Sequence, residues 1–163
     1  ANWVRTLDYV EVTDVELDNA TYLAAEKPYL DNDTDKAIRQ FNKYLTQFPN
    51  GIHALKSHFY LAQLYYKKNL FENAQPHYNY VVDTSKSEYT EQATVKLCEI
   101  YLSNNNWDKA IPVLQRLEAE ADYPQNVIYA QSNLMNAYFQ TDDLPLEITI
   151  SPRPPSKGFQ SLI

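Results

Sequence analysis

The chain has 163 residues and a mass of 19.0 kDa, which suits one domain large enough to bury a core. Its two glycines disfavour sheet-rich folds and phosphate-binding loops, and a net charge of -7 argues against a nucleic-acid partner. No run of 18 apolar residues occurs, so we predict no direct membrane insertion, and a single cysteine excludes an internal disulfide.

The first residues contain neither an initiator Met nor a signal peptide, so we expect the chain to be a fragment of a longer protein. Residues 1–17 alternate Val10, Val12 and Val15 with acidic neighbours. This pattern is consistent with a short extended N-terminal lead or a weak helix, which we expect to belong to a preceding repeat or a linker.

Similar short segments recur along the middle of the chain, around Ala37, Ala74 and Ala110, at intervals of 37 and 36 residues. A large residue follows each alanine by four positions, so the two share one face of a helix. These large residues are Phe41, Tyr78 and Leu114.

A second helix precedes each of these segments. Twelve residues before the three alanines stand Ala25, Ala62 and Cys98, whose small side chains allow two helices to approach closely. The pattern predicts seven helices, near residues 19–31, 34–47, 52–68, 71–83, 88–103, 107–120 and 126–140.

Polar residues mark several helix ends. Ser85 with Glu88 predicts a capping box before the fifth helix, and Asn106 is expected to cap the sixth. The acidic run of Asp31, Asp33 and Asp35 resembles the start of a calcium loop, but it lacks the Gly and Glu that such a loop requires. We therefore interpret it as a cap of the second helix.

The register resembles the tetratricopeptide-repeat (TPR) family, with a large residue, Leu, a small residue and Tyr in one helix, then an aromatic and Ala in the next. The resemblance implies an all-α fold, a right-handed TPR superhelix or α-α solenoid of about three and a half helical hairpins. Pro28 and Thr34 depart from the pattern in the first repeat. The predicted domain is 18–140, divided into 18–51, 52–87, 88–124 and a half repeat at 125–140.

The pattern stops after the seventh helix. Glu147 stands where a fourth repeat needs a small residue, and Pro152, Pro154 and Pro155 favour an extended conformation. Residues 141–163 are therefore expected to form an irregular Pro-rich tail. A truncation scar, a shifted reading frame, a short strand and a linker to a further domain are all consistent with it.

The resemblance also implies a concave groove lined by the first helix of each hairpin, which holds a protein or peptide partner. Exposed aromatic side chains beside polar groups suit such a surface. The alternative is that the rings of Tyr29, Tyr66 and Phe139 pack between hairpins. The groove positions are Tyr22, Glu26, Tyr29, Lys56, Phe59, Gln63, Tyr66, Gln92, Val95, Glu99, Leu102, Tyr129, Ser132, Asn136 and Phe139.

Because these positions are mostly acidic, amide or aromatic, we predict no basic clamp for a terminal carboxylate of the kind found in chaperone-binding TPR domains. We also predict no enzyme, cofactor or metal site. Cys98 occupies a small-residue packing position and is expected to be an inert buried thiol, and His53, His58 and His77 lack metal-ligand spacing.

The leading interpretation is a protein-interaction scaffold. The alternatives are a structural spacer within a longer TPR superhelix and a regulatory appendage of a catalytic domain elsewhere in the parent chain. The stretch from Phe48 to Tyr66 resembles a bacterial envelope subgroup that includes the cell-division coordinator of the Tol system and an outer-membrane assembly lipoprotein. This likeness implies the periplasm or outer membrane, with the cytoplasm as the alternative.

Overall fold

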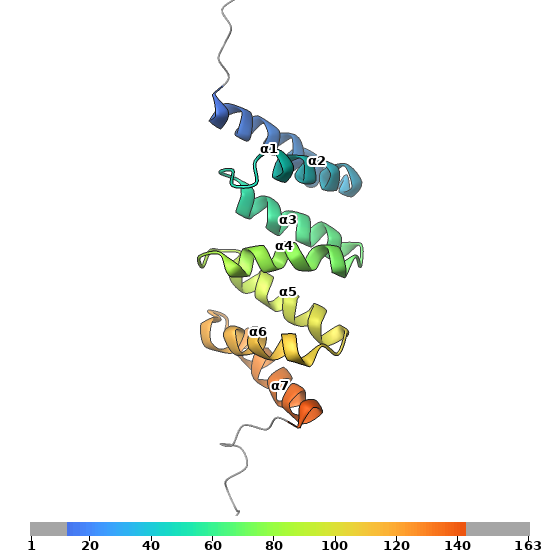
Figure 1. Ribbon diagram of the computed structural model, residues 1–163, viewed down its shortest axis with the longest axis vertical. Helices are drawn as coiled ribbons and strands as arrows, with labels where there is room; N and C mark the ends of the chain where they lie inside the picture. Colours follow the sequence, from blue (N-terminus) through green and yellow to red (C-terminus); the bar gives the residue numbers. More distant parts are fainter. Residues whose placement is uncertain (1–12, 143–163) are drawn as a thin grey trace, which may run out of the picture.

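The computed structural model describes residues 13–142, and this part of the chain contains α-helices and no strand. Figure 1 shows the helices stacked in a single column along the long axis. The predicted all-helical solenoid is confirmed, and the seven helices are α1 (Asp14–Leu30), α2 (Thr34–Gln47), α3 (Ala54–Lys67), α4 (Phe71–Asp83), α5 (Thr90–Ser103), α6 (Trp107–Glu120) and α7 (Pro124–Thr141).

Helix α1 begins earlier than the sequence suggested. Thr13 and Glu16 form a capping box, in which the Thr13 Oγ1 accepts from the Glu16 N–H at 3.3 Å and the Glu16 carboxylate accepts from the Thr13 N–H at 2.9 Å. Residues 14–17, expected to form part of a lead or a weak helix before the repeats, therefore belong to α1. The prediction for the Pro-rich tail concerns residues that, beyond Asp142, lie outside the described part.

Each helix packs against the next one along the chain, so α1–α2, α3–α4 and α5–α6 form three hairpins and α7 follows as a single helix. The small residues predicted to allow this packing have no exposed surface. They are Ala25, Ala37, Ala62, Ala74, Cys98 and Ala110.

The turn inside each hairpin repeats one backbone geometry. Asn32, Asn69 and Asn105 are left-handed, with φ of 58°, 59° and 52°, a conformation that Asn tolerates better than most residues. The next N–H then bonds a carbonyl five residues back, as in Asp33 to Pro28 at 2.8 Å. Asp142, with φ 56°, continues the series after another 37 residues.

Two carboxylates fix the loops between hairpins. Buried Asp18 accepts from the Tyr44 hydroxyl at 2.6 Å and from the Ile52 N–H at 2.9 Å. Glu91 occupies the same repeat position in α5 and accepts from the N–H groups of Asp122 and Tyr123, at 2.9 and 3.1 Å. Each carboxylate thereby ties the first helix of its hairpin to the start of the next hairpin.

The predicted helix caps are partly confirmed. Asp33 and Asn106 cap α2 and α6, accepting from the N–H groups of Lys36 and Lys109. The capping box of Ser85 with Glu88 is wrong, because α5 begins at Thr90 with Tyr89 at the N-cap and no side-chain cap bond. The preceding turn is held instead by Ser87 and Thr90, whose Oγ1 accepts from the Ser87 N–H at 2.8 Å.

Candidate partner-binding groove

The predicted groove residues all lie on α1, α3, α5 and α7, the first helices of successive repeats. We call the face that carries them the A-surface. Two of them do not belong to it, because the side chains of Tyr22 and Phe59 are only 3% and 4% exposed. Their rings fill space between helices, Tyr22 against Tyr44 and Phe59 against Tyr89, so the prediction that they face a partner is wrong.

In the N-terminal half of the A-surface, polar side chains form hydrogen bonds and ion pairs with one another. The hydroxyl of Tyr22 donates to Glu26 at 2.6 Å, and Lys56 reaches the same carboxylate at 3.2 Å. Further along α1, the Tyr29 hydroxyl donates to Gln63 of α3 at 3.1 Å. The hydrogen bond from Tyr22 holds the pKa of Glu26 below its ordinary value, so this carboxylate stays charged.

The same arrangement recurs between α3 and α5. The Tyr66 hydroxyl donates to Glu99 at 2.6 Å, and burial together with this bond raises the pKa of Tyr66 to about 12. Lys96 bonds the same carboxylate at 2.7 Å and lies 4.4 Å from the centre of the Tyr66 ring. Sequence analysis missed Lys96, although its spacing of three residues from Glu99 places the two on one helix face.

Both lysines of this surface are therefore paired with glutamates, Lys56 with Glu26 and Lys96 with Glu99. Neither presents an isolated positive charge to a terminal carboxylate. The bonds from Tyr29 to Gln63 and from Tyr66 to Glu99 also link successive repeats, so this half of the surface is fixed in shape before any partner arrives.

The C-terminal half of the A-surface is more open. Gln92, Ser132, Asn136 and Phe139 are exposed, whereas Val95, Leu102 and Tyr129 are partly buried. A cleft of about 560 Å³ lies between the start of α5 and the start of α7. Its lining includes Gln92 and Val95 together with three residues that the sequence analysis did not single out, Tyr123, Gln125 and Asn126.

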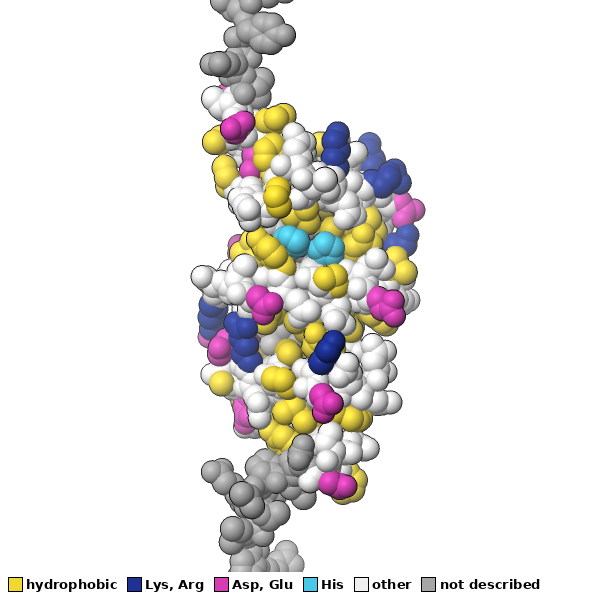
Figure 2. Space-filling view, in the orientation of Figure 1, with side chains coloured by type: hydrophobic (Ala, Val, Ile, Leu, Met, Phe, Trp, Pro, Cys, Tyr) yellow, Lys and Arg dark blue, Asp and Glu magenta, His cyan; other side chains and the backbone are white. Residues whose placement is uncertain are grey.

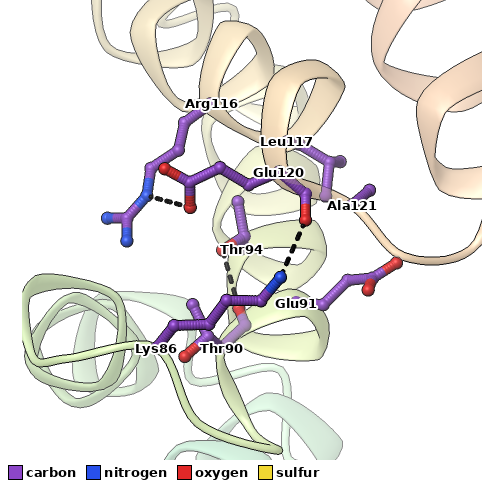
Figure 3. Close-up of a pocket in the computed structure, with 8 residues that line it drawn as sticks. All are labelled: Lys86, Thr90, Glu91, Thr94, Arg116, Leu117, Glu120 and Ala121. Carbon is purple, nitrogen blue, oxygen red and sulfur yellow. Dashed lines mark hydrogen bonds and ion pairs between the residues drawn. The ribbon is translucent and has the colours of Figure 1, made fainter.

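A second hollow lies beside this cleft, and its lining residues hold neighbouring helices together (Figure 3). The Lys86 Nζ donates to the Glu120 carbonyl at 3.2 Å, and the Arg116 guanidinium donates to the Val82 carbonyl at 2.6 Å. These cations satisfy carbonyl oxygens at the ends of α6 and α4. The space between them is about 10 Å³, which suits one water molecule at most.

The candidates for catalysis are poorly placed. Cys98 is fully buried, as predicted, and burial raises the pKa of its thiol to about 12. Within residues 13–142 no three His, Cys, Asp or Glu side chains gather as a metal site would require. In the same range, no helix is both long and apolar enough to cross a bilayer.

The histidines form a contact that the sequence did not predict. Figure 2 shows two histidine side chains next to each other on one face of the molecule. The Nδ1 atoms of His58 and His77 are 2.8 Å apart, and His58 stacks on Tyr80 with 3.8 Å between ring centres. Burial and the neighbouring ring lower the pKa of His58 to about 4, so the pair is neutral near pH 7.

Comparison with known families agrees with this architecture. The family model described as a tetratricopeptide repeat-like domain matches residues 4–131, most of the chain. The chain belongs to this family. No curated protein matches the sequence. Tetratricopeptide repeat-like domains are typically non-catalytic and suggest a protein-interaction scaffold, and the partly open A-surface is compatible with that role.

Proposed function

We propose that this tetratricopeptide repeat-like domain is a scaffold that holds a peptide or a partner subunit on its A-surface, at the cleft between α5 and α7. The observation that carries the proposal is the cleft itself. Its volume of about 560 Å³ lies in the range of ligand sites, and it contains the predicted groove residues Gln92 and Val95.

The lining indicates the chemistry of the partner. Gln92 and Gln125 are exposed amides that can both donate to and accept from a peptide main chain, and Val95 adds apolar surface. The Glu91 carboxylate already accepts from the N–H groups of Asp122 and Tyr123, in the loop between α6 and α7, so it serves to shape the cleft. This combination suits an extended peptide bound through its backbone.

The test uses a phage-displayed library of random peptides selected on the full chain. A selected peptide is labelled, and its affinity is measured by fluorescence anisotropy for the wild type and for Gln92→Arg with Gln125→Arg. We expect at least a tenfold loss, about 1.4 kcal/mol, because two long side chains fill the cleft. The control is Asn73→Arg with Gln47→Arg, which adds the same charge at exposed positions on α4 and α2.

A selection that yields no binder, or binders unaffected by the cleft variant, would remove this proposal and favour the structural spacer. The regulatory appendage predicts that the partner is a catalytic domain of the parent chain. The envelope location stays a prediction from sequence resemblance, to be tested by fractionation of the native cell.

A further inference from the structure

The positive charges of the chain are concentrated in one stretch of the sequence. Residues 36–71 contain six Lys and Arg residues and no Asp or Glu, which leaves eight of the 14 cations and all 21 acidic residues to the rest of the chain. Figure 2 shows several Lys and Arg side chains gathered at the end of the column that holds α1 and α2. A positive surface on a chain of net charge -7 favours an acidic partner locally.

Three of these six cations form a row along α2. Lys36, Arg39 and Lys43 are exposed, and their spacing of three and four residues puts them on one side of the helix. None of the three takes part in an ion pair within residues 13–142. Asp35, the one acidic residue of α2, is paired with Lys68. We call Lys36, Arg39 and Lys43 the α2 stripe.

A groove with apolar surface lies beside the α2 stripe, between α1 and α2. It has a volume of about 370 Å³, and its α1 side presents Leu23, Ala24 and Pro28. Leu23 is 56% exposed, so this side chain is available to a partner. The α2 side presents Lys36, the first member of the stripe, and Gln40.

The other charges of the groove are already engaged. Lys27 and Asp31 form an ion pair at 3.0 Å, and the Asp33 carboxylate accepts from the Lys36 N–H as the cap of α2. The unpaired ammonium group of Lys36 and the stripe that continues from it therefore set the sign of the charge that the groove attracts.

The remainder of the molecule limits the size of an acidic partner. Outside residues 36–71 the acidic residues outnumber the cations by 21 to eight, so a large polyanion such as a nucleic acid or an anionic bilayer is repelled along much of the column. A short acidic segment interacts mainly with the stripe, because charges beyond about 8 Å are largely screened at physiological salt.

We propose that the α2 stripe and the groove beside it bind an acidic amphipathic helix of a partner protein. The stripe is about 10 Å long at helical rise, so carboxylates at the same three- and four-residue spacing on a partner helix can meet all three cations. Apolar residues on the adjoining face of that helix cover Leu23 and Ala24. A helix bound there continues the helix-on-helix packing of the solenoid.

The test uses a dye-labelled peptide of about 18 residues, long enough to form an amphipathic helix, with Leu and Ala on one face and Glu on the other. Its affinity for the full chain is measured by fluorescence anisotropy and compared with that of a peptide in which every Glu is replaced by Lys. The protein variant is Lys36→Glu. Its control is Lys109→Glu, which reverses the same charge at the equivalent exposed position of α6, where the N–H also donates to the N-cap side chain.

We expect the Glu peptide to bind at least about tenfold more tightly than the Lys peptide, and its affinity to fall as salt rises. Lys36→Glu should weaken the Glu peptide by about tenfold, whereas Lys109→Glu should stay within about twofold of the wild type. Leu23→Ala should weaken it by about threefold, because apolar surface is lost from the groove.

Equal affinities of the two peptides, or equal losses in Lys36→Glu and Lys109→Glu, would overturn the proposal. Failure of the full chain to bind either peptide would overturn it as well. Binding of phosphatidylserine vesicles that Lys36→Glu abolishes, without binding of the Glu peptide, would overturn it in favour of a lipid surface. The groove shares no lining residue with the cleft between α5 and α7, so the two proposals fail separately.

Discussion

Replacing Asp18 with alanine is the most direct test of how the hairpins are joined. The side chain is 5% exposed and accepts two hydrogen bonds, from the Tyr44 hydroxyl at 2.6 Å and the Ile52 N–H at 2.9 Å. The Tyr44 oxygen in turn accepts from the His53 N–H at 2.9 Å. Asp18→Ala leaves two donors without their acceptor, at about 1–3 kcal/mol each.

We therefore expect Asp18→Ala to lower the free energy of unfolding by about 3 kcal/mol, or the melting temperature by about 6–12 °C. Repeats unfold partly on their own, so the assay combines thermal unfolding by circular dichroism with hydrogen exchange of α1 and α2. The control is Asp14→Ala, which removes the same charge from an exposed site in α1 and should cost about 0.5 kcal/mol. Equal effects of the two substitutions would refute the reasoning.

Two further predictions concern polar groups that are partly or fully buried. Burial lowers the pKa of His58 to about 4 and also lowers the pKa of His77 in the folded state, so the unfolded chain binds more protons below pH 6.5. The contribution of the pair to stability is therefore complete above pH 6.5 and is lost as the pH falls toward the folded-state pKa values. Acidification should thus lower the free energy of unfolding by about 1–2 kcal/mol, allowing for solvent screening. In urea titrations, the free energy of unfolding should fall less between about pH 7 and 5 for His58→Asn than for the wild type. The buried Ser57 Oγ has no partner among the described residues, so Ser57→Ala should raise stability by about 0.5–1.5 kcal/mol in a urea titration; a loss of stability would reveal a bond there.

Much of the fold could be predicted because it depends on short-range spacing. Ala37, Ala74 and Ala110 recur at nearly constant intervals, and the helices around them begin and end close to the predicted residues. The start of α1 could also have been predicted from the sequence, because Thr13 and Glu16 have capping-box spacing.

The site was harder to predict because it depends on how rings turn between helices. Tyr22 and Phe59 occupy groove positions by sequence, yet their side chains turn into the core. The contact of His58 with His77 joins two helices at a separation of 19 residues, so it depends on the register of α3 against α4, which no local pattern specifies.

The two halves of the A-surface differ for a physical reason that bears on partner selection. In the first half, the hydroxyls of Tyr29 and Tyr66 bond the next repeat at Gln63 and Glu99, so a partner must break an existing bond to use them. In the second half, Leu102 stands at the same repeat position as these tyrosines and carries no hydroxyl, which leaves the exposed Asn136 without such a donor. A partner gains most where polar groups are still open to exchange, because every protein–partner bond then replaces a bond to water alone. We therefore expect selectivity to reside at the C-terminal half, beside the cleft lined by Gln92, with the first half serving as a rigid support.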